Sequence, residues 1–341
     1  MTEFSFPSWS GRTDGPGPEH ARWHSLVKPV NNTEPGFALL GFACDEGVIR
    51  NQGVAGAVEG PAAIRAALGS MAVHHGIALF DGGDAVVSHG DLEGTQHRYG
   101  QALAQLLQQH KLTVGLGGGH EITWASYQGV RAAFPTAKLG IINLDAHFDN
   151  RGTDQATSGT GFAQIMAAEQ QAGQQPVVLT LGVAEASNTA DVFNRARETG
   201  IGWVTDDRWV TYPSQAGAAV AQLLEQVDVV YLTIDLDVLP AATAPGVSAP
   251  ASYGVPLPLV SAVIDHVAGS GKLVHADIAE LNPQRDQDGR TAMVAARFVD
   301  RLTTAERGRN LVTDQPTESV QPAYSAPETG QPQGIEYNQY R

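Results

Sequence analysis

The chain has 341 residues, 42% of them hydrophobic and 17% charged, so it is long enough to bury a large core. Its formal net charge of −15 at pH 7 argues against nucleic acid or an anionic membrane as a partner, because phosphate groups are bound by basic surfaces. No apolar run approaches the ~20 residues of a membrane span, and the first residues lack the basic and apolar stretches of a signal peptide.

Short strand-like runs alternate with longer helix-like runs along most of the chain. The expected strands begin near Phe37, Ile77, Leu112, Leu139, Val177, Ile201, Val229 and Leu273. Helical patterns lie between them at residues 61–68, 97–110, 158–171, 189–199, 214–227 and 257–268. Pro61 suits the first turn of a helix and Gly200 suits the position after a helix end. This alternation predicts an α/β fold with a mostly parallel sheet of roughly eight strands.

Composition divides the chain into three parts. Residues 1–36, rich in glycine and proline, are interpreted as an N-terminal extension packed on the domain formed by residues 37–305. Residues 306–341 contain four prolines among Gln, Ser, Thr and Gly, and we expect a C-terminal tail there. Cys44 is the only cysteine, so no internal disulfide can form and we expect a cytoplasmic protein.

Acidic and histidine side chains follow three of the predicted strands. They form the segments Gly117-Gly118-Gly119-His120, Asp145-Ala146-His147-Phe148-Asp149 and Asp235-Leu236-Asp237. Alternate residues of a strand share one face, and ligands of parallel sheets bind beyond the carboxyl ends of the strands. We therefore expect these side chains to meet in one crevice.

The combined set holds four carboxylates and two imidazoles, and it has no thiolate. Such donors favour harder ions such as Mn²⁺ over structural zinc. Six side chains exceed one catalytic coordination shell, so two ions are predicted, with a water between them that becomes a nucleophilic hydroxide near neutral pH.

Other readings of individual residues remain open at this stage. The glycine run before His120 could cradle a phosphate, but the rest of a P-loop is missing, and a tight backbone approach to the metal site is favoured. His275 lies in an apolar strand beside Asp277 and could be a core histidine or a support for the site. Most other histidines are expected at the surface.

Together with Asp277-Ile278-Ala279-Glu280-Leu281-Asn282-Pro283, these segments closely resemble the ureohydrolase (arginase) superfamily, from about Gly41 to Val299. The resemblance implies a three-layer α/β/α arginase-like catalytic domain and two Mn²⁺ per subunit. It implies that one ion is bound by His120, Asp145, Asp149 and Asp235. It implies that the other is bound by Asp145, His147, Asp235 and Asp237, with Asp145 and Asp235 bridging.

Within the superfamily the chain resembles the formimidoylglutamases, which hydrolyse N-formimino-L-glutamate to L-glutamate and formamide in histidine degradation. The segments that carry this narrower resemblance are Trp9–Gly15, Gly41–Gly47, Asn51-Gln52-Gly53, Phe148-Asp149-Asn150-Arg151, Ser158-Gly159-Thr160 and Ser187-Asn188-Thr189. The substrate of that family has two carboxylates and no free α-amine.

The resemblance also implies roles at the substrate. Glu280 is expected to pair with the cationic formimino group, and Arg151 and Ser158 are expected to orient carboxylates. Asn188 is counted among the substrate-binding residues. Phe162 stands where arginases carry a proton-transferring histidine, so Asp149 is the expected proton carrier.

Alternatives concern both the substrate and the class of protein. Another ureohydrolase, acting on arginine, agmatine or a guanidino acid, would use the same metal ligands. A single-zinc deacetylase lacks the second ligand group, and a metal-binding pseudoenzyme would not be expected to retain all six ligands. The expected partner is a small-molecule substrate, and a homo-oligomer is left open.

Overall fold

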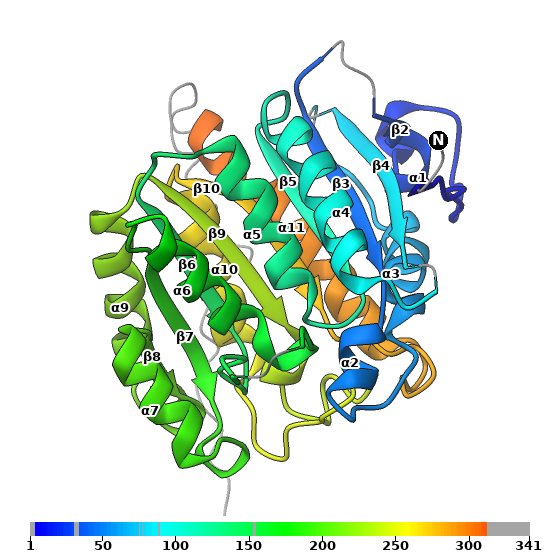
Figure 1. Cartoon of the computed structure of the whole chain (residues 1–341). Coiled ribbons are helices and arrows are strands. Elements are labelled where there is room, and N and C mark those ends of the chain that lie inside the picture. Colours follow the sequence, from blue (N-terminus) through cyan, green and yellow to red (C-terminus); the bar gives the residue numbers. More distant parts are fainter. Residues whose placement is uncertain are drawn as a thin grey trace, which may run out of the picture.

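The computed structural model describes residues 4–30, 34–74, 76, 78–87, 89–152 and 155–311. One mixed sheet runs through the molecule in the order β1-β4-β3-β5-β10-β9-β6-β7-β8, with β2 paired to β4 (Figure 1). Only the pairing of β1 with β4 is antiparallel among these strands. The strands are β1 (Phe4–Ser5), β2 (Lys28–Pro29), β3 (Phe37–Ala43), β4 (Leu79–Val86), β5 (Leu112–Gly117), β6 (Leu139–Leu144), β7 (Val177–Val183), β8 (Gly202–Thr205), β9 (Val229–Asp235) and β10 (Leu273–Ala279).

The helices cover both faces of this sheet. The α-helices are α1 (Trp23–Leu26), α2 (Glu46–Arg50), α3 (Gly60–Gly69), α4 (Leu92–Leu107), α5 (Ile122–Ala133), α6 (Gly161–Gln171), α7 (Ala190–Thr199), α8 (Asp206–Thr211), α9 (Pro213–Gln226), α10 (Leu257–Gly269) and α11 (Arg290–Leu311). Short 3₁₀ turns are η1 (Pro18–His20), η2 (Ala57–Glu59), η3 (Ser158–Thr160), η4 (Glu185–Ser187) and η5 (Leu236–Val238). Among the described residues, no helix is both long and apolar enough to span a membrane.

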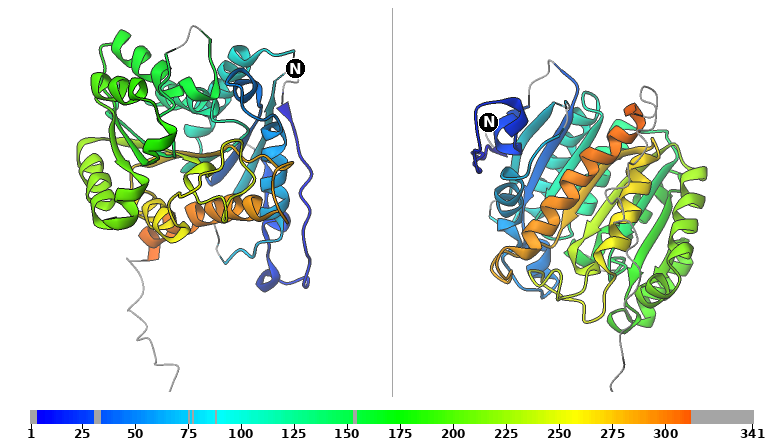
Figure 2. Two further views of the ribbon diagram at one scale, coloured as in Figure 1. Left: turned by 90° about the horizontal axis from the view of Figure 1, so that it is seen from below. Right: turned by 180° about the vertical axis from the view of Figure 1, so that it is seen from behind.

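Two separate hydrophobic clusters define three layers. The cluster on one face combines strand residues with α3, α8, α9, α10 and α11, and the other combines them with α4, α5, α6 and α7. Figure 2 shows α11 (orange) and α10 (yellow) side by side on the face turned away from the viewer in Figure 1. Side chains of a strand alternate between the clusters, as Ile141 and Ile142 do in β6, because successive residues point to opposite faces.

The predicted α/β/α architecture is confirmed, and so is the mostly parallel sheet. The sheet has ten strands rather than roughly eight, because residues of the N-terminal segment add β1 and β2 beside β4. Two-residue strands have no periodicity from which they could be predicted. The strand expected near Ile77 begins at Leu79, and Ile77 itself lies outside the described residues.

Helix ends follow the expected local chemistry at two positions. Pro61 lies in the first turn of α3, where its missing N–H costs no hydrogen bond. Gly200 ends α7 with φ of 80°, a left-handed conformation that glycine adopts without a steric penalty. Helices α5 and α11 were not among the predicted helices.

The N-terminal segment lies against the domain, and the last helix extends beyond the predicted domain boundary. Trp9 Nε1 donates to Asp81 Oδ2 at 2.8 Å, and the Trp9 ring stacks on Trp23, which is fully buried. Helix α11 continues to Leu311, beyond the boundary drawn at residue 306. The rest of the predicted tail, from residue 312, lies outside the described residues, and a tail there stays a prediction.

The strand order places the carboxyl ends of β5, β10, β9 and β6 next to one another. After β5 the chain crosses to β6, and β9 and β10 later fill the space between them. Ligands of open parallel sheets bind where neighbouring connections diverge in this way. The predicted metal ligands and Glu280 lie at or just after the carboxyl ends of these four strands, whereas the predicted substrate-binding residue Asn188 follows β7.

Candidate metal centre

His120 follows β5 and faces three carboxylates from two other strands. Its Nδ1 atom lies 2.9 Å from Asp149 Oδ2, 3.2 Å from Asp145 Oδ2 and 3.3 Å from Asp235 Oδ2. The four side chains meet the geometric requirement for holding one metal ion. They are the residues that the resemblance implied for the first ion.

His147 is the centre of a second group. Its Nδ1 atom lies 3.0 Å from Asp237 Oδ2 and 3.5 Å from Asp145 Oδ1. Asp145, His147 and Asp237 could hold a second ion. Asp145 belongs to both groups and turns one carboxylate oxygen to each histidine, which is the geometry of a bridging ligand.

Asp235 was also expected to bridge, and its geometry differs from that of Asp145. One oxygen faces His120, and the other accepts the backbone N–H of Asp237 at 2.8 Å, as Asp145 Oδ1 accepts that of His147 at 2.6 Å. Unlike Asp145 Oδ1, this second oxygen of Asp235 is paired with no histidine among the described residues. Asp235 falls in the first group and not in the second. A bridging role for Asp235 stays a prediction.

The buried carboxylates of the two groups need positive charge nearby to offset their mutual repulsion. Burial raises the pKa of Asp235, and the charges of Asp237 and Asp145 raise it further. Burial also raises the pKa of Asp145, but as long as no metal is bound, hydrogen bonds from protonated His120 and His147 outweigh it and lower the pKa overall. Carboxylates buried this close together repel one another unless positive charge compensates them. The residues present therefore fit a pair of divalent ions.

Behind His120 a buried chain of hydrogen bonds fixes the orientation of the imidazole. His120 Nε2 lies 2.9 Å from Thr233 Oγ1, and that hydroxyl donates to Asp277 Oδ1 at 2.6 Å. Because the Thr233 proton is given to the carboxylate, Nε2–H of His120 donates to the hydroxyl, and Nδ1 keeps its lone pair for a metal. Such supports of a ligating histidine set its tautomer and basicity.

Asp277 accepts further hydrogen bonds from buried side chains of neighbouring elements. Its Oδ2 atom accepts from Ser126 Oγ and from Tyr231 Oη, both at 2.6 Å. His275 lies 3.0 Å from the Ser126 hydroxyl and 2.7 Å from that of Thr113, and burial lowers its pKa to about 3. His275 is thus a neutral core histidine that is also joined to the network. In the sequence these residues could be recognised only as polar residues within otherwise apolar strands.

Two of the predicted catalytic residues have an uncommon backbone conformation. Asp149 has φ of 46° and Glu280 has φ of 70°, and both are among the five non-glycine residues with positive φ in the described chain. Left-handed conformations of ordinary residues are sparsely populated and persist where the surroundings enforce them, often at functional sites.

Glu280 leads from β10 into the site. Its Oε1 atom accepts the backbone N–H of His120 at 2.8 Å, and its own N–H donates to Gly118 at 2.8 Å. Burial and the nearby Glu121 raise the pKa of Glu280 to about 8. A cation beside this carboxyl group would lower its pKa again and pair with the carboxylate.

Arg151 and Ser158 are joined through a residue that the predicted site did not include. Arg151 Nη1 donates to Asn51 Oδ1 at 2.7 Å, and Asn51 Nδ2 donates to Ser158 Oγ at 3.1 Å. Asn51 caps the carboxyl end of α2, more than one hundred positions before Ser158. The sequence marked it only as part of a matching segment.

Asn188 lies against the loop that carries His147. Its Nδ2 atom donates to Ala146 O at 2.8 Å and to Ala184 O at 2.9 Å, and its Oδ1 atom accepts the N–H of Phe148 at 3.3 Å. These bonds use both amide protons, so only the oxygen retains capacity for a further partner. Substrate binding by Asn188 stays a prediction.

Phe162 is fully buried and sits beside the metal ligands through its backbone. Its N–H donates to Asp149 O at 3.0 Å, and its ring belongs to one of the two hydrophobic clusters. Position 162 therefore offers no proton carrier to the site.

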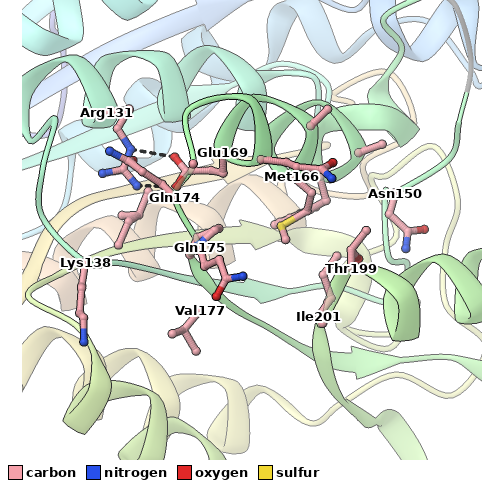
Figure 3. A pocket seen from close by; sticks show the side chains of 18 of the residues that line it. Arg131, Lys138, Asn150, Met166, Glu169, Gln174, Gln175, Val177, Thr199 and Ile201 are labelled. Atoms are coloured by element: carbon pink, nitrogen blue, oxygen red, sulfur yellow. Dashed lines mark hydrogen bonds and ion pairs between the residues drawn. The ribbon is translucent and has the colours of Figure 1, made fainter.

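A large hollow lies elsewhere, along the side of the sheet where α6 packs (Figure 3). It has a volume of about 1260 Å³, and its lining includes Lys138 and Val177 near the amino ends of β6 and β7. Arg131 and Glu169, which pair at 2.8 Å, form part of its wall. Neither metal group contributes to this wall.

Comparison with known proteins adds an independent finding. The sequence matches the arginase family over residues 35–304. It is 45% identical over 304 residues to a formimidoylglutamase of Rhodococcus opacus, covering 87% of this chain and 95% of that protein. It is 48% identical over 303 residues to a formimidoylglutamase of Nocardia farcinica, covering 87% of this chain and 96% of that protein.

Solved structures resemble the fold. A formimidoylglutamase of Bacillus subtilis superposes with a TM-score of 0.76 at 21% identity, covering 84% of this chain and 92% of the other. A formiminoglutamase of Trypanosoma cruzi, solved with Mn²⁺, superposes with a TM-score of 0.74 at 24% identity, covering 84% of this chain and 98% of the other. At these identities the likeness concerns the fold alone.

Proposed function

The chain belongs to the arginase family, and we propose that it is a formimidoylglutamase, which hydrolyses N-formimino-L-glutamate to L-glutamate and formamide. The observation that carries the proposal is the pair of ligand groups joined through Asp145, together with Arg151, which follows the ligand Asp149 by two positions and has a guanidinium suited to a substrate carboxylate. The curated relatives named above support the choice of substrate.

We propose Mn²⁺ as the resident ion at both groups. The donor set supports this choice, because carboxylate oxygens and imidazole nitrogens without thiolate suit Mn²⁺. His120, Asp145, Asp149 and Asp235 would hold one ion, and Asp145, His147, Asp237 and Asp235 the other. Bound there, two ions would neutralise the buried carboxylates and generate a hydroxide nucleophile from water.

The side chains around the metal ligands bind the substrate and transfer a proton in the proposed reaction. Glu280 pairs with the cationic formimino group and Arg151 binds a carboxylate of glutamate, with Ser158 as a further donor. Hydroxide adds to the formimino carbon, and the bond from this carbon to the glutamate nitrogen then breaks. Asp149 takes the proton of the added hydroxyl group and hands it to that nitrogen as the bond breaks, so that the hydroxyl oxygen becomes the carbonyl oxygen of formamide and glutamate leaves with its free amine.

The setting of the reaction is part of the proposal. The product L-glutamate would connect it with histidine degradation, as the resemblance implies, and the single buried cysteine is compatible with the cytoplasm. The proposed partner is a small molecule, and the acidic chain offers no reason to invoke nucleic acid.

A product analysis tests this function. The Mn²⁺-loaded protein is incubated separately with N-formimino-L-glutamate, L-arginine and agmatine, and formamide, urea and the amine products are quantified. We expect formamide and L-glutamate from the first substrate only. Faster release of urea from either guanidine would overturn the assignment in favour of another ureohydrolase.

A further inference from the structure

Asn51 stands between two residues that we propose to bind substrate, and it contacts both. It accepts a hydrogen bond from Arg151 at 2.7 Å and donates one to Ser158 at 3.1 Å. Ser158 is buried, Asn51 is half-buried and Arg151 is exposed. The three side chains therefore run from the protein interior to the surface.

The direction of every hydrogen bond in this chain is fixed by chemistry. A guanidinium has only donors, so the amide oxygen of Asn51 must face Arg151. The amide nitrogen then faces Ser158, and the serine oxygen must accept. The hydroxyl proton of Ser158 is consequently left to donate to a further group.

The guanidinium of Arg151 also keeps capacity for a ligand. No carboxylate in the described part of the chain forms an ion pair with Arg151, and its side-chain partner is the neutral amide of Asn51. A guanidinium that has no ion pair within the described ranges, linked through Asn51 to a buried hydroxyl donor, forms a surface that fits a carboxylate.

The surroundings hold this arrangement in place before any substrate arrives. The N–H of Arg151 donates to Gly159 O at 3.0 Å, and a Cβ atom at Gly159 would lie 3.3 Å from Asn51 Nδ2 and 3.4 Å from Arg151 Nη1. On the other side Arg50 ties α2 to Ala156 O at 3.2 Å and to Glu93 Oε1 at 2.6 Å. The backbone thus brings Asn51 against both partners.

We propose that Asn51 is a specificity-determining positioning residue that selects substrates bearing a carboxylate, an inference that rests on the proposed function. Its neutral amide orients Arg151 without neutralising it and directs the Ser158 proton toward the substrate. An aspartate of the same shape would do the opposite. It would pair with Arg151 and would require the Ser158 hydroxyl to donate to it.

The test is Asn51→Asp, compared with Asn194→Asp as a matched control. Asn194 likewise accepts from an arginine, with Arg197 Nη1 at 2.8 Å, but it is exposed on α7. Calorimetry measures the Kd of L-glutamate for each Mn²⁺-loaded protein, and kinetics compare N-formimino-L-glutamate with N-methylformamidine, which has no carboxylate. Metal content and thermal unfolding are recorded for every variant.

We expect Asn51→Asp to raise the Kd of L-glutamate and the KM of N-formimino-L-glutamate by about ten- to a hundredfold, because a charged hydrogen bond is lost. The kcat, the metal content and the hydrolysis of N-methylformamidine should stay close to wild type, and Asn194→Asp should change none of these. An unchanged Kd for L-glutamate would overturn the inference. Equal losses for both amidines would also overturn it, because they would indicate a merely structural role.

Two further measurements distinguish failure of this inference from failure of the proposed function. Ser158→Ala retains the bond between Arg151 and Asn51 and should weaken L-glutamate binding by a few fold; no change would refute the role given to the hydroxyl proton. If the wild-type protein released no formamide but bound L-glutamate in an Asn51-dependent manner, the proposed function would fail and the carboxylate subsite would stand.

Discussion

The Nε2 atom of His120 lies 2.9 Å from the hydroxyl oxygen of Thr233. Thr233 stands two positions before the predicted metal ligand Asp235, and it orients His120, a predicted ligand that follows another strand. The contact crosses from β9 to the loop after β5, with β10 between them in the sheet. Asp277 of that intervening strand completes the link by accepting the hydroxyl proton.

Thr233→Val should weaken metal binding while leaving the fold intact. Valine has nearly the shape of threonine but cannot accept the proton of His120, and loss of such a support lowers metal affinity by about 10–100-fold. Competition with a fluorescent chelator measures this affinity. Thr180→Val is the control, because the Thr180 hydroxyl is buried without a partner in the described chain and its removal should be neutral or stabilising. Equal metal affinity in both variants would contradict the role of Thr233.

Asp145→Ala and Asp237→Ala should differ in metal stoichiometry. Asp145 belongs to both ligand groups, so its loss should empty both positions and abolish activity, whereas loss of Asp237 leaves the four residues around His120 in place. Elemental analysis after dialysis should give about zero and about one ion per chain. The control Asp206→Ala removes a buried acid outside both groups and should retain two ions. Two ions in Asp145→Ala would refute the bridging role.

Arg151→Ala should raise the KM of N-formimino-L-glutamate by about ten- to a hundredfold with a smaller change in kcat, because a charged hydrogen bond to a carboxylate is worth about 1.5–3 kcal/mol. Steady-state kinetics with Mn²⁺-loaded protein measure both constants. Arg195→Ala removes a half-buried arginine paired with Asp191 on α7 and serves as the control. Unchanged kinetics in Arg151→Ala would exclude the proposed contact.

His275 should make stability depend on pH in the acid range. Burial lowers its pKa to about 3 in the folded protein, below the value of ~6.5 for an exposed histidine. Between these two pKa values the unfolded chain therefore binds a proton that the folded chain does not. The contribution of neutral His275 to the free energy of unfolding is fully present above about pH 6.5. Below that it falls by about 1.4 kcal/mol per pH unit as the pH decreases.

Replacing this histidine isolates its contribution. The free energy of urea unfolding, measured from pH 7 to pH 5, should fall less steeply in His275→Gln than in the wild type. His266→Gln, at the last turn of α10, serves as the comparison and should keep the wild-type slope. Parallel curves for wild type and His275→Gln would show that His275 does not titrate in this way.

The metal ligands could be predicted because their pattern is local. Asp145, His147 and Asp149 alternate directly after one apolar strand, and Asp235 and Asp237 after another, so a parallel sheet was enough to predict that they meet. His120 joined them for the same reason. The structure brings all six together in two overlapping groups.

The supports of the site could not be predicted because their partners are remote in sequence. Thr233 meets His120 across 113 positions and Asp277 across 44, and Asn51 meets Arg151 across 100. A threonine or asparagine side chain can form hydrogen bonds with many nearby groups, and its actual partner is determined only when the sheet has assembled. The two-residue strands β1 and β2 escaped prediction for a similar reason, since their pairing with β4 and not their own sequence makes them strands.

The left-handed backbone at Asp149 and Glu280 has a consequence for directed evolution of this protein. Each such residue stores about 1–3 kcal/mol of conformational strain, and glycine at either position would relieve it. A selection for heat resistance alone would therefore favour glycine where the proposed chemistry needs carboxylates. Tolerance of high temperature and turnover would be expected to trade against each other at these two positions.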